Sequence, residues 1–417
     1  MFLFSFPLLG FIFCSWTFTK GNLAEMSDPN VKDTLLVAPA LYPSFLPDFF
    51  KNNGVSYALK PNGKYKITFT TNIVFPEAST TIRDNATTWP TKNGQDAPDT
   101  TASIDDDLRS FTNGNSRGFY WKVPTEVEEI VINAQVVVTG GFWTSGQNLI
   151  IHGATTDRTK HTLQGSEDGY WKNGRTADNT NEWRYTAISG FGGGTVTIEN
   201  LTVAKARAYN INSYDTKMIA DNIRIINGRD VNETLGNNDG FGGGAGSEIR
   251  NSLINVTDDG VKFYRNDQKA INCTIHHNKN GAPFQFGWGS EQGATGCEIT
   301  DCTIVRNPTV ANYNLAPLTL TNRKATAVEL VVDVIIKKGN NGGVEGLEFV
   351  NGDYTGKKII SQFSGAPFIP LVAGRTSKTI GANNASISIK GKGNVLGFTS
   401  SDVDWQHTQG QCNISFF

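Results

Sequence analysis

The sequence EIRNSLINVTDDGVKFYRNDQKAINCTIHH, residues 248–277, contains two short apolar segments with asparagine at the same place. EIRNSLINV centres on Asn251 and AINCTIHH centres on Asn272. Further copies are IENLTV at 198–203, IADNIRII at 219–226 and EITDCTIV at 298–305. The central residues in register are Asn200, Asn222, Asn251, Asn272 and Asp301. The pattern therefore returns after roughly 20–30 residues, a spacing typical of repeat proteins.

The length of this repeat selects one fold. A unit of this size with one short strand and no helical period indicates a solenoid. The segments lack the Leu-x-x-Leu-x-Leu frame of leucine-rich repeats, and propeller blades need about 40 residues each. A parallel β-helix remains, because strands and turns fill roughly 20–25 residues per winding at a rise of ~3.3 Å per strand residue. We predict an all-β chain in which residues 116–417 form a parallel β-helix with asparagines stacked at the turns.

The residues before this solenoid divide into two parts. Met1–Ser15 is an aromatic-rich apolar run, too short to span a bilayer comfortably, and residues 1–20 are predicted to be a secretory signal peptide. Residues 21–115 are predicted to be a small β-rich N-terminal region, with strands in the alternating segment Tyr65–Phe75. We therefore expect an extracellular protein with no membrane contact after signal removal.

The overall charge argues against one class of partner. The 417 residues include 37 Lys and Arg and 39 Asp and Glu, for a net charge of −2. The chain as a whole offers no cationic surface for nucleic acid, although this sum says nothing of a local basic groove. The content of 44 glycines is typical of a β protein with many turns. Gly192–Gly194 and Gly242–Gly244 are predicted to occupy turns that need positive φ.

Cysteines and glycosylation triplets fit a secreted chain. Cys273, Cys297, Cys302 and Cys412 follow the signal, and the sequence does not choose among their three pairings or plain buried thiols. Cys273 and Cys302 occupy the same slot in two repeats, so stacking alone would bring them together. Asn-x-Ser/Thr triplets stand at Asn85, Asn200, Asn232, Asn255, Asn272, Asn384 and Asn413. Such triplets are common by chance, and those within strands need not be modified.

Three aspartates lie about one winding apart. Asp239 precedes the doublet Asp258–Asp259, with the strand-like segment Glu248–Val256 between them. On a β-helix Asp239 should therefore lie one rung below the doublet. Adjacent strand residues point to opposite faces, so both members of the doublet serve one site only at a bend, which Gly260 favours. Crowding carboxyl groups in this way raises the pKa of at least one of them.

The same face gains further side chains from the next winding. Lys262 is predicted to return to the outer face beside the acids, and the position one winding later is Gln285, with Trp288 shortly after. Side chains on successive windings would line an elongated groove, and a groove of this kind suits a polymer of sugars. Hydrolysis of such a polymer needs one protonated carboxyl group and one carboxylate. In the alternative interpretation the aspartates are turn and capping residues, and one form of this interpretation has them surround a calcium ion.

The stretch VTDDGVKFYRNDQKAINCTIHHNKNGAPFQFGW, residues 256–288, resembles the active-site region of glycoside hydrolase family 49, the dextranase and isopullulanase family. The matching positions are Asp258, Asp259, Lys262, Tyr264, Asn278, Gln285, Gly287 and Trp288, with Asp239 as the family's upstream acid. The resemblance implies a right-handed parallel β-helix, an N-terminal β-sandwich and hydrolysis with inversion. It makes Asp258 the general acid, and Asp239 and Asp259 the groups that activate water. The substrate contacts would be Lys262, Tyr264, Asn278, Gln285 and Trp288.

Two departures bear on the substrate. Gly260 follows the doublet where the family often has alanine, and the chain is shorter on both sides of the site. The related polygalacturonases use a Gly-His-Gly turn and an Arg-x-Lys that binds uronate. Here the turn reads Asn278-Lys279-Asn280-Gly281, and Asn322-Arg323-Lys324 is a poor substitute. A neutral α-glucan is therefore favoured over pectin.

The remaining histidines and tryptophans have weaker signals. His276 and His277 follow a strand, but no further histidine lies near them in the sequence, so we expect neither a metal nor another cofactor. Trp143, Trp171 and Trp183 would line distal sugar subsites, or pack under loops and at the solenoid end. Together these observations predict a secreted, monomeric, inverting glycosidase that cleaves internal bonds of a dextran- or pullulan-like polysaccharide. The alternatives are a hydrolase of a pectic or algal polysaccharide and a non-catalytic β-helix that binds glycans.

Overall fold

The computed structural model describes most of the chain from residue 42 onward. The described ranges are 42–75, 81–83, 91–92, 95–96, 108–113, 116–165, 186–206, 209–213, 215–226, 238–278, 281–286, 293–307, 318–322, 330–337, 347–350, 359–363, 385–391, 403–405 and 412–416. The predicted signal peptide, residues 1–20, lies outside them. Residues Ser44–Phe417 form one compact unit. No helix among the described residues is long and apolar enough to cross a membrane.

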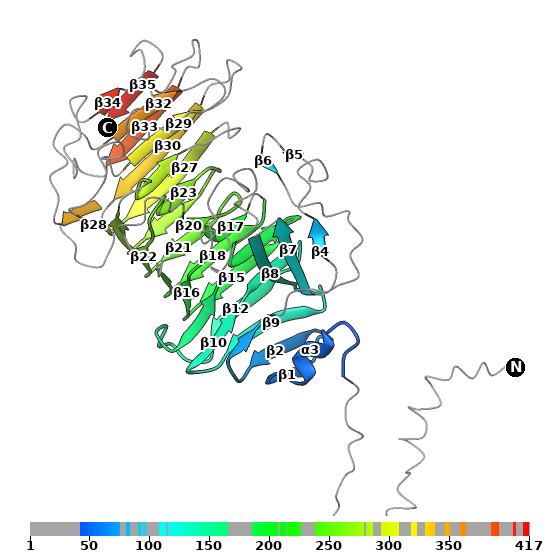
Figure 1. The fold of residues 1–417 in the computed structure, drawn as a ribbon. Helices are drawn as coiled ribbons and strands as arrows, with labels where there is room; N and C mark the ends of the chain where they lie inside the picture. Colours follow the sequence, from blue (N-terminus) through cyan, green and yellow to red (C-terminus); the bar gives the residue numbers. More distant parts are fainter. Residues whose placement is uncertain are drawn as a thin grey trace, which may run out of the picture. The chain divides into compact units, whose positions relative to one another are not determined.

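Three long sheets make up this unit, and successive coils contribute one strand to each (Figure 1). The first sheet contains, in spatial order, β1 (Val55–Leu59), β2 (Tyr65–Phe69), β9 (Val127–Ile132), β12 (Leu149–Gly153), β15 (Thr195–Glu199), β18 (Lys217–Asp221), β21 (Glu248–Arg250), β24 (Lys269–Ile271), β27 (Gly293–Thr300), β30 (Leu330–Lys337), β33 (Ala385–Gly391) and β35 (Cys412–Phe416). The second contains β3 (Ile73–Val74), β10 (Val136–Thr139), β13 (His161–Gln164), β16 (Thr202–Ala204), β19 (Arg224–Ile226), β22 (Leu253–Asn255), β25 (Thr274–His277), β28 (Cys302–Arg306) and β31 (Leu347–Val350).

The third sheet carries the aspartates. From the last coil back to the first it contains β34 (Val403–Trp405), β32 (Ile359–Phe363), β29 (Leu318–Asn322), β26 (Phe284–Phe286), β23 (Val261–Phe263), β20 (Asp239–Gly242), β17 (Tyr209–Ser213), β14 (Ile188–Phe191), β11 (Gly141–Ser145), β8 (Ser116–Lys122), β7 (Leu108–Asn113) and β4 (Thr81–Arg83). A separate pair is formed by β5 (Thr91–Lys92) and β6 (Gln95–Asp96), and the one described α-helix is α3 (Asp48–Lys51).

The strands of neighbouring coils run parallel. For example, β18 pairs with β21 and β21 with β24, and the same coils pair in parallel in the other two sheets. The all-β, right-handed parallel β-helix that the repeat and the family resemblance predict is therefore confirmed. Within residues 21–115, β1 and β2 extend the first sheet and β3 extends the second. The domain boundary at residues 115–116 stays a prediction.

The asparagine register fixes the turn between the first and second sheets. All five predicted residues adopt the left-handed conformation: φ is 56° at Asn200, 51° at Asn222, 52° at Asn251, 51° at Asn272 and 50° at Asp301. Asparagine tolerates this region better than most residues do, which explains its recurrence. Asn222 donates to the Asn200 carboxamide oxygen at 2.8 Å, and Asn272 donates to that of Asn251 at 2.8 Å. The stacked asparagines predicted from the sequence are confirmed.

Columns of apolar side chains from successive coils fill the interior. In the first sheet the paired, buried residues are Ile130, Ile151, Ile198, Ala220, Ile249, Ala270 and Ile299. In the third they are Phe142, Ile188, Ile211, Phe241, Val261, Phe284 and Leu318. Each large apolar side chain that is fully buried stabilises the fold by about 1.5–3 kcal/mol. At the first coils Phe50 of α3 packs edge-on against Trp121, with ring centroids 4.9 Å apart, and closes this column.

Two sequence expectations need correction or completion. Gly192–Gly194 have φ between 75° and 84°, as predicted, but Gly242–Gly244 do not have positive φ. Close approach explains Gly243 and Gly244, because a Cβ at Gly243 would lie 2.3 Å from Ser247 Oγ and one at Gly244 would lie 2.7 Å from the backbone of Asp215. Cys273, Cys297 and Cys302 are buried cysteine thiols, and Cys273 and Cys302 are neighbours as their shared slot predicts.

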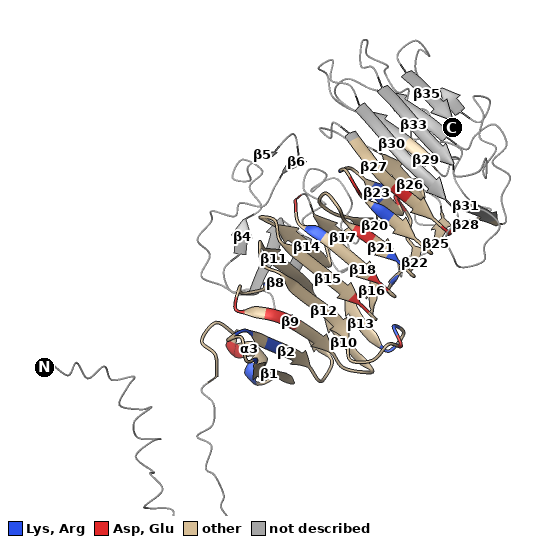
Figure 2. Cartoon of the chain, turned by 180° about the vertical axis from the view of Figure 1, so that it is seen from behind, with Lys and Arg blue, Asp and Glu red and all other residues tan. Residues whose placement is uncertain are grey.

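Lys and Arg residues and Asp and Glu residues are both spread over the described strands, in keeping with the near-zero net charge (Figure 2). The asparagines of three glycosylation triplets form side-chain hydrogen bonds: Asn200 and Asn255 accept one each at 2.8 Å, and Asn272 donates one. Asn85, Asn232 and Asn384 lie outside the described residues. Glycosylation stays a prediction.

The turn asparagines generate a stability prediction. Asn222 donates to Asn200 and, at 2.9 Å, to the carbonyl oxygen of Thr156. Asn222→Ala removes both bonds and leaves a Cβ in the left-handed region, so we expect a loss of about 2–3 kcal/mol in the free energy of unfolding, measured by urea denaturation. Asn222→Gly removes the bonds alone and should lose about 1 kcal/mol. Equal losses in the two variants would show that the backbone conformation is not what requires asparagine.

Candidate active site

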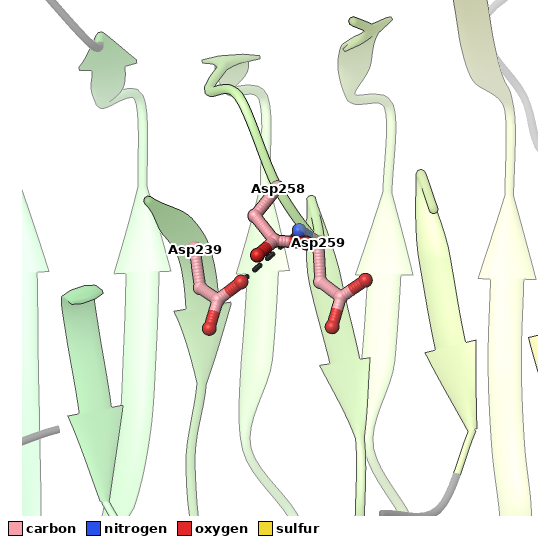
Figure 3. A group of neighbouring side chains, drawn as sticks. All are labelled: Asp239, Asp258 and Asp259. Carbon is pink, nitrogen blue, oxygen red and sulfur yellow. Dashed lines mark hydrogen bonds between the residues drawn. The ribbon is translucent and has the colours of Figure 1, made fainter. Parts of the chain in front are cut away.

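The three aspartates meet where two neighbouring strands of the third sheet begin (Figure 3). Asp239 is the first residue of β20, and Asp259 lies two residues before β23. The backbone joins the two coils here, because Gly240 N–H donates to the Asp259 carbonyl at 2.8 Å and Asp258 N–H to that of Asn238 at 3.2 Å. Carboxylate oxygens of all three aspartates lie within 4.8 Å of one another. The predicted one-rung relation is confirmed.

A bend lets both members of the doublet serve one site. Thr257, Asp258 and Gly260 form bends before β23. The Asp259 N–H donates to Asp239 Oδ1 at 3.1 Å, and Asp259 Oδ1 accepts from the Ala282 N–H at 2.9 Å. Asp239 and Asp259 are only 4% and 6% exposed, whereas Asp258 is half-buried. Asp258 is therefore the most accessible acid of the three.

Glycines make room for this arrangement. Gly281 has φ of +62°, and a Cβ there would lie 2.2 Å from the Asp258 carbonyl carbon and 2.4 Å from its Oδ1. A Cβ at Gly240 would lie 2.2 Å from the Gly260 carbonyl oxygen. The coils on either side of the doublet can approach it only because these positions have no side chain.

Lys262 supplies the positive charge next to the buried acids. Its ammonium forms an ion pair with Asp239 Oδ2, and its Nζ lies 3.8 Å from Asp259 Oδ2. Nζ also lies 4.4 Å from the ring centroid of Tyr209 and 5.3 Å from that of Tyr264. The side chain is almost fully buried. Because burying a charge without a partner is costly, the two carboxylates and the ammonium stabilise one another.

Burial and charge act on Asp239 in opposite directions. Burial and the neighbouring Asp259 raise the pKa of Asp239, the Lys262 ammonium opposes them, and the pKa is about 7. Burial lowers the pKa of Lys262, but Asp239 and the other acidic neighbours hold it well above its usual value. The site therefore combines a lysine that stays charged with a carboxyl group that exchanges its proton near neutral pH.

The other predicted site residues have different positions. Gln285 pairs in register with Lys262, as their separation of one winding predicts, and is buried. Asn278 donates to the Val256 carbonyl at 2.5 Å and to Asn255 Oδ1 at 2.8 Å, so its carboxamide holds the chain that enters the doublet. Tyr264 flanks the ammonium and is half-buried. Trp288 lies outside the described residues.

Residues of the preceding coil, which the spacing in the sequence did not reveal, also contact the site. Tyr209 pairs in register with Asp239. The sequence separation between these two residues is longer than the separation between any two successive residues of the asparagine register. The Asn210 carboxamide donates to Asn238 Oδ1 and to the Asp239 carbonyl, both at 2.8 Å. The polar Tyr-Asn pair at the start of β17 was a signal, but the length of the loop that follows it hid its register.

The remaining candidates lie elsewhere. His276 is half-buried and His277 buried on β25 of the second sheet, and burial lowers the pKa of His276. Trp143 lies on β11, and its ring packs against Phe191 with centroids 5.9 Å apart. Trp171 and Trp183 lie outside the described residues.

The fold and this site define a parallel β-helix protein with three clustered carboxyl groups and a buried lysine. Comparison with known proteins shows a similarity to a dextranase. A dextranase of Arthrobacter globiformis is 24% identical over 110 residues, which are 26% of this chain and 17% of that protein. The resemblance to the dextranases is thus confirmed by a curated relative, of whose length this chain spans about a sixth.

The chain is also similar to part of a solved structure. The solved structure of Dex49A from Penicillium minioluteum matches with a TM-score of 0.39 and 14% identity, covering 71% of this chain and 55% of that one. No protein-family model matches the chain.

The contact between Gly281 and the doublet predicts a selective effect of one methyl group. Gly281→Ala adds a Cβ that overlaps the Asp258 backbone, so we expect its melting temperature to fall by several degrees. Gly193→Ala is the matched control, because Gly193 also has positive φ, +84°, but no atom lies within 4 Å of the place where its Cβ would stand. If the two variants melt alike, the backbone conformation alone explains the glycine at 281.

Proposed function

We propose that this chain is a glycosidase that cleaves internal α-glucosidic bonds of a dextran- or pullulan-like polysaccharide, with inversion of the anomeric centre. One observation carries the proposal: two buried carboxylates share an ammonium, and a third, more accessible carboxyl group has an oxygen within 4.8 Å of theirs. Hydrolysis of a glycosidic bond needs a proton donor for the leaving oxygen and a carboxylate that activates water.

The burial of the three groups suggests their roles. Asp258 is the most accessible, so we propose it as the general acid that protonates the glycosidic oxygen. Asp239 and Asp259 are held in place by backbone N–H groups and by Lys262, so we propose that they position and deprotonate the water. The pKa of about 7 at Asp239 gives it useful basicity near neutral pH.

The spacing of the carboxyl groups bears on stereochemistry. Inverting enzymes usually separate the two carboxyl groups by about 6.5–9.5 Å and retaining enzymes by about 5–5.5 Å. The approach of oxygens to within 4.8 Å is closer to the second range. We nevertheless propose inversion, because Asp239 and Asp259 are buried and already bonded, so a small water molecule reaches the sugar more readily than either carboxylate does.

The charge of the site favours a neutral substrate. The Lys262 ammonium is engaged by Asp239 and Asp259, so it offers little to a uronate carboxylate. The similarity to a dextranase supports an α-glucan in particular. We propose Tyr264, Gln285 and Trp288 as further residues of the substrate groove, and Asn278 as a support for the doublet. A polymer substrate and the predicted signal peptide suggest that the protein acts outside the cell, and we propose that it does so as a monomer.

The assignment of Asp258 predicts the loss of activity in a nearly isosteric variant. Asp258→Asn should lower reducing-sugar release from dextran or pullulan by about 10²–10⁴-fold, because the carboxamide cannot donate the proton. The melting temperature should change little, since this residue is only half-buried.

The matched control is Asp301→Asn. It makes the same chemical change at a turn where the other coils have asparagine, so activity should be retained. Polygalacturonate cleavage by the wild type would move the substrate to the pectic class. If the folded wild-type protein cleaves none of dextran, pullulan and polygalacturonate but binds a glycan, the result would favour the non-catalytic glycan-binding module.

The stereochemical proposal predicts the first anomer formed. Proton NMR of a fresh digest of an α-glucan should show the β-anomer of the new reducing end before mutarotation equilibrates it. Initial formation of the α-anomer would contradict inversion and would make one of the close carboxylates a nucleophile. Asp258→Asn, incubated in parallel, controls for spontaneous hydrolysis.

A further inference from the structure

The side chain of Lys262 runs along the sheet instead of outward from it. Lys262 pairs in register with Gly242 on the preceding coil. A Cβ at Gly242 would lie 3.5 Å from the Lys262 Cβ and 3.9 Å from the Lys262 Cδ. The lysine stem therefore lies over a position that has no side chain. From there the ammonium reaches Asp239 on the same preceding coil and Tyr209 one coil further back.

Acidic and aromatic side chains from several strands surround the ammonium. Asp239 of β20 and Asp259 face it with carboxylate oxygens, and Asp258 belongs to the same carboxylate cluster. Tyr209 of β17 and Tyr264 face it with their rings, at 4.4 and 5.3 Å from the centroids. On β26 the neighbour in register is the uncharged Gln285. An ammonium near aromatic faces and carboxylates is stabilised by both, more strongly when water is excluded.

We propose that Lys262 is a positioning residue and not a substrate contact: its ammonium, held beside Tyr209 and Tyr264, keeps Asp239 and Asp259 together in the geometry that activates water. This inference rests on the proposed glycosidase function for its catalytic consequence. Without the ammonium, two buried carboxylates would face each other across neighbouring coils, and one of them would take up a proton or move away. A proton on either group removes a hydrogen-bond acceptor for the attacking water.

The kinetic test compares Lys262→Met with Lys262→Arg on the best α-glucan. Methionine keeps most of the stem without the charge, so kcat should fall at least 30-fold while KM stays within about threefold. The acidic limb of the kcat/KM profile should move to higher pH, because the carboxylates lose their cation. Arginine keeps the charge and should restore part of kcat. A KM increase above tenfold with unchanged kcat would instead make Lys262 a substrate contact.

A second measurement needs no substrate. Lys262→Met should lower the melting temperature at pH 8, and the difference from wild type should shrink as the pH falls to 5. The sign follows from Asp239: burial holds its pKa in the folded state above the unfolded value, and removing the lysine raises that pKa further, so protonation on acidification favours the folded variant more than the folded wild type. No loss at pH 8, or a loss that is constant with pH, would overturn the proposal.

The matched control is Lys269→Met on β24 of the first sheet. Lys269 lies in register between Glu248 and Glu298, so it too is a lysine flanked by acids, but it is partly exposed. Its melting temperature and kcat should stay close to wild type. If wild-type protein hydrolyses none of the glycans, the proposed function fails, while the pH-dependent melting of Lys262→Met still decides the structural role of the lysine.

Discussion

The register between neighbouring coils is the constraint on which the rest of this structure depends. Successive coils add strands to three sheets and pair in parallel within them, so a residue is placed directly over a residue roughly one winding away in the sequence. The hydrogen-bonded ladders fix this relation, and the apolar columns inside them penalise any slip, since a shift by one residue would turn each column outward. Residues far apart in sequence thus share a site without a long-range loop to hold them.

The acid cluster uses this register together with a local departure from it. Regular strands would send Asp258 and Asp259 to opposite faces, and the bend before β23 avoids that. Stacking then places Asp259 over Asp239, which would be unfavourable for two buried carboxylates in isolation. Lys262 lies on the same coil as the doublet and turns back over Gly242, so one element supplies both the second acid and the compensating cation.

The sequence predicted those features that repeat with the coil. The asparagine turns, the pairing of Lys262 with Gln285 and the one-rung relation of the aspartates follow from spacings of about one winding, and each is present. What the sequence could not predict depends on loops and side-chain direction. The pairing of Tyr209 with Asp239 was hidden by the long stretch of sequence between them. The periodicity of a sequence also does not show that a lysine side chain runs along a sheet instead of away from it. Gly242–Gly244 were assigned to positive φ, whereas close contacts explain Gly243 and Gly244.

Gly260, which follows the doublet, can be understood in the same terms. A Cβ at Gly260 would lie 2.7 Å from Ile275 Cγ2 and 2.8 Å from the Pro283 carbonyl oxygen. Gly260 N–H also donates to the Ala282 carbonyl at 2.8 Å, so the following coil is drawn close at this point. That approach brings the Ala282 N–H onto Asp259 Oδ1 and leaves Gly281 as the residue that fits beside Asp258. The glycine at 260 is therefore coupled to the way this chain holds its doublet, and an alanine there would require the 281–283 segment to move as well.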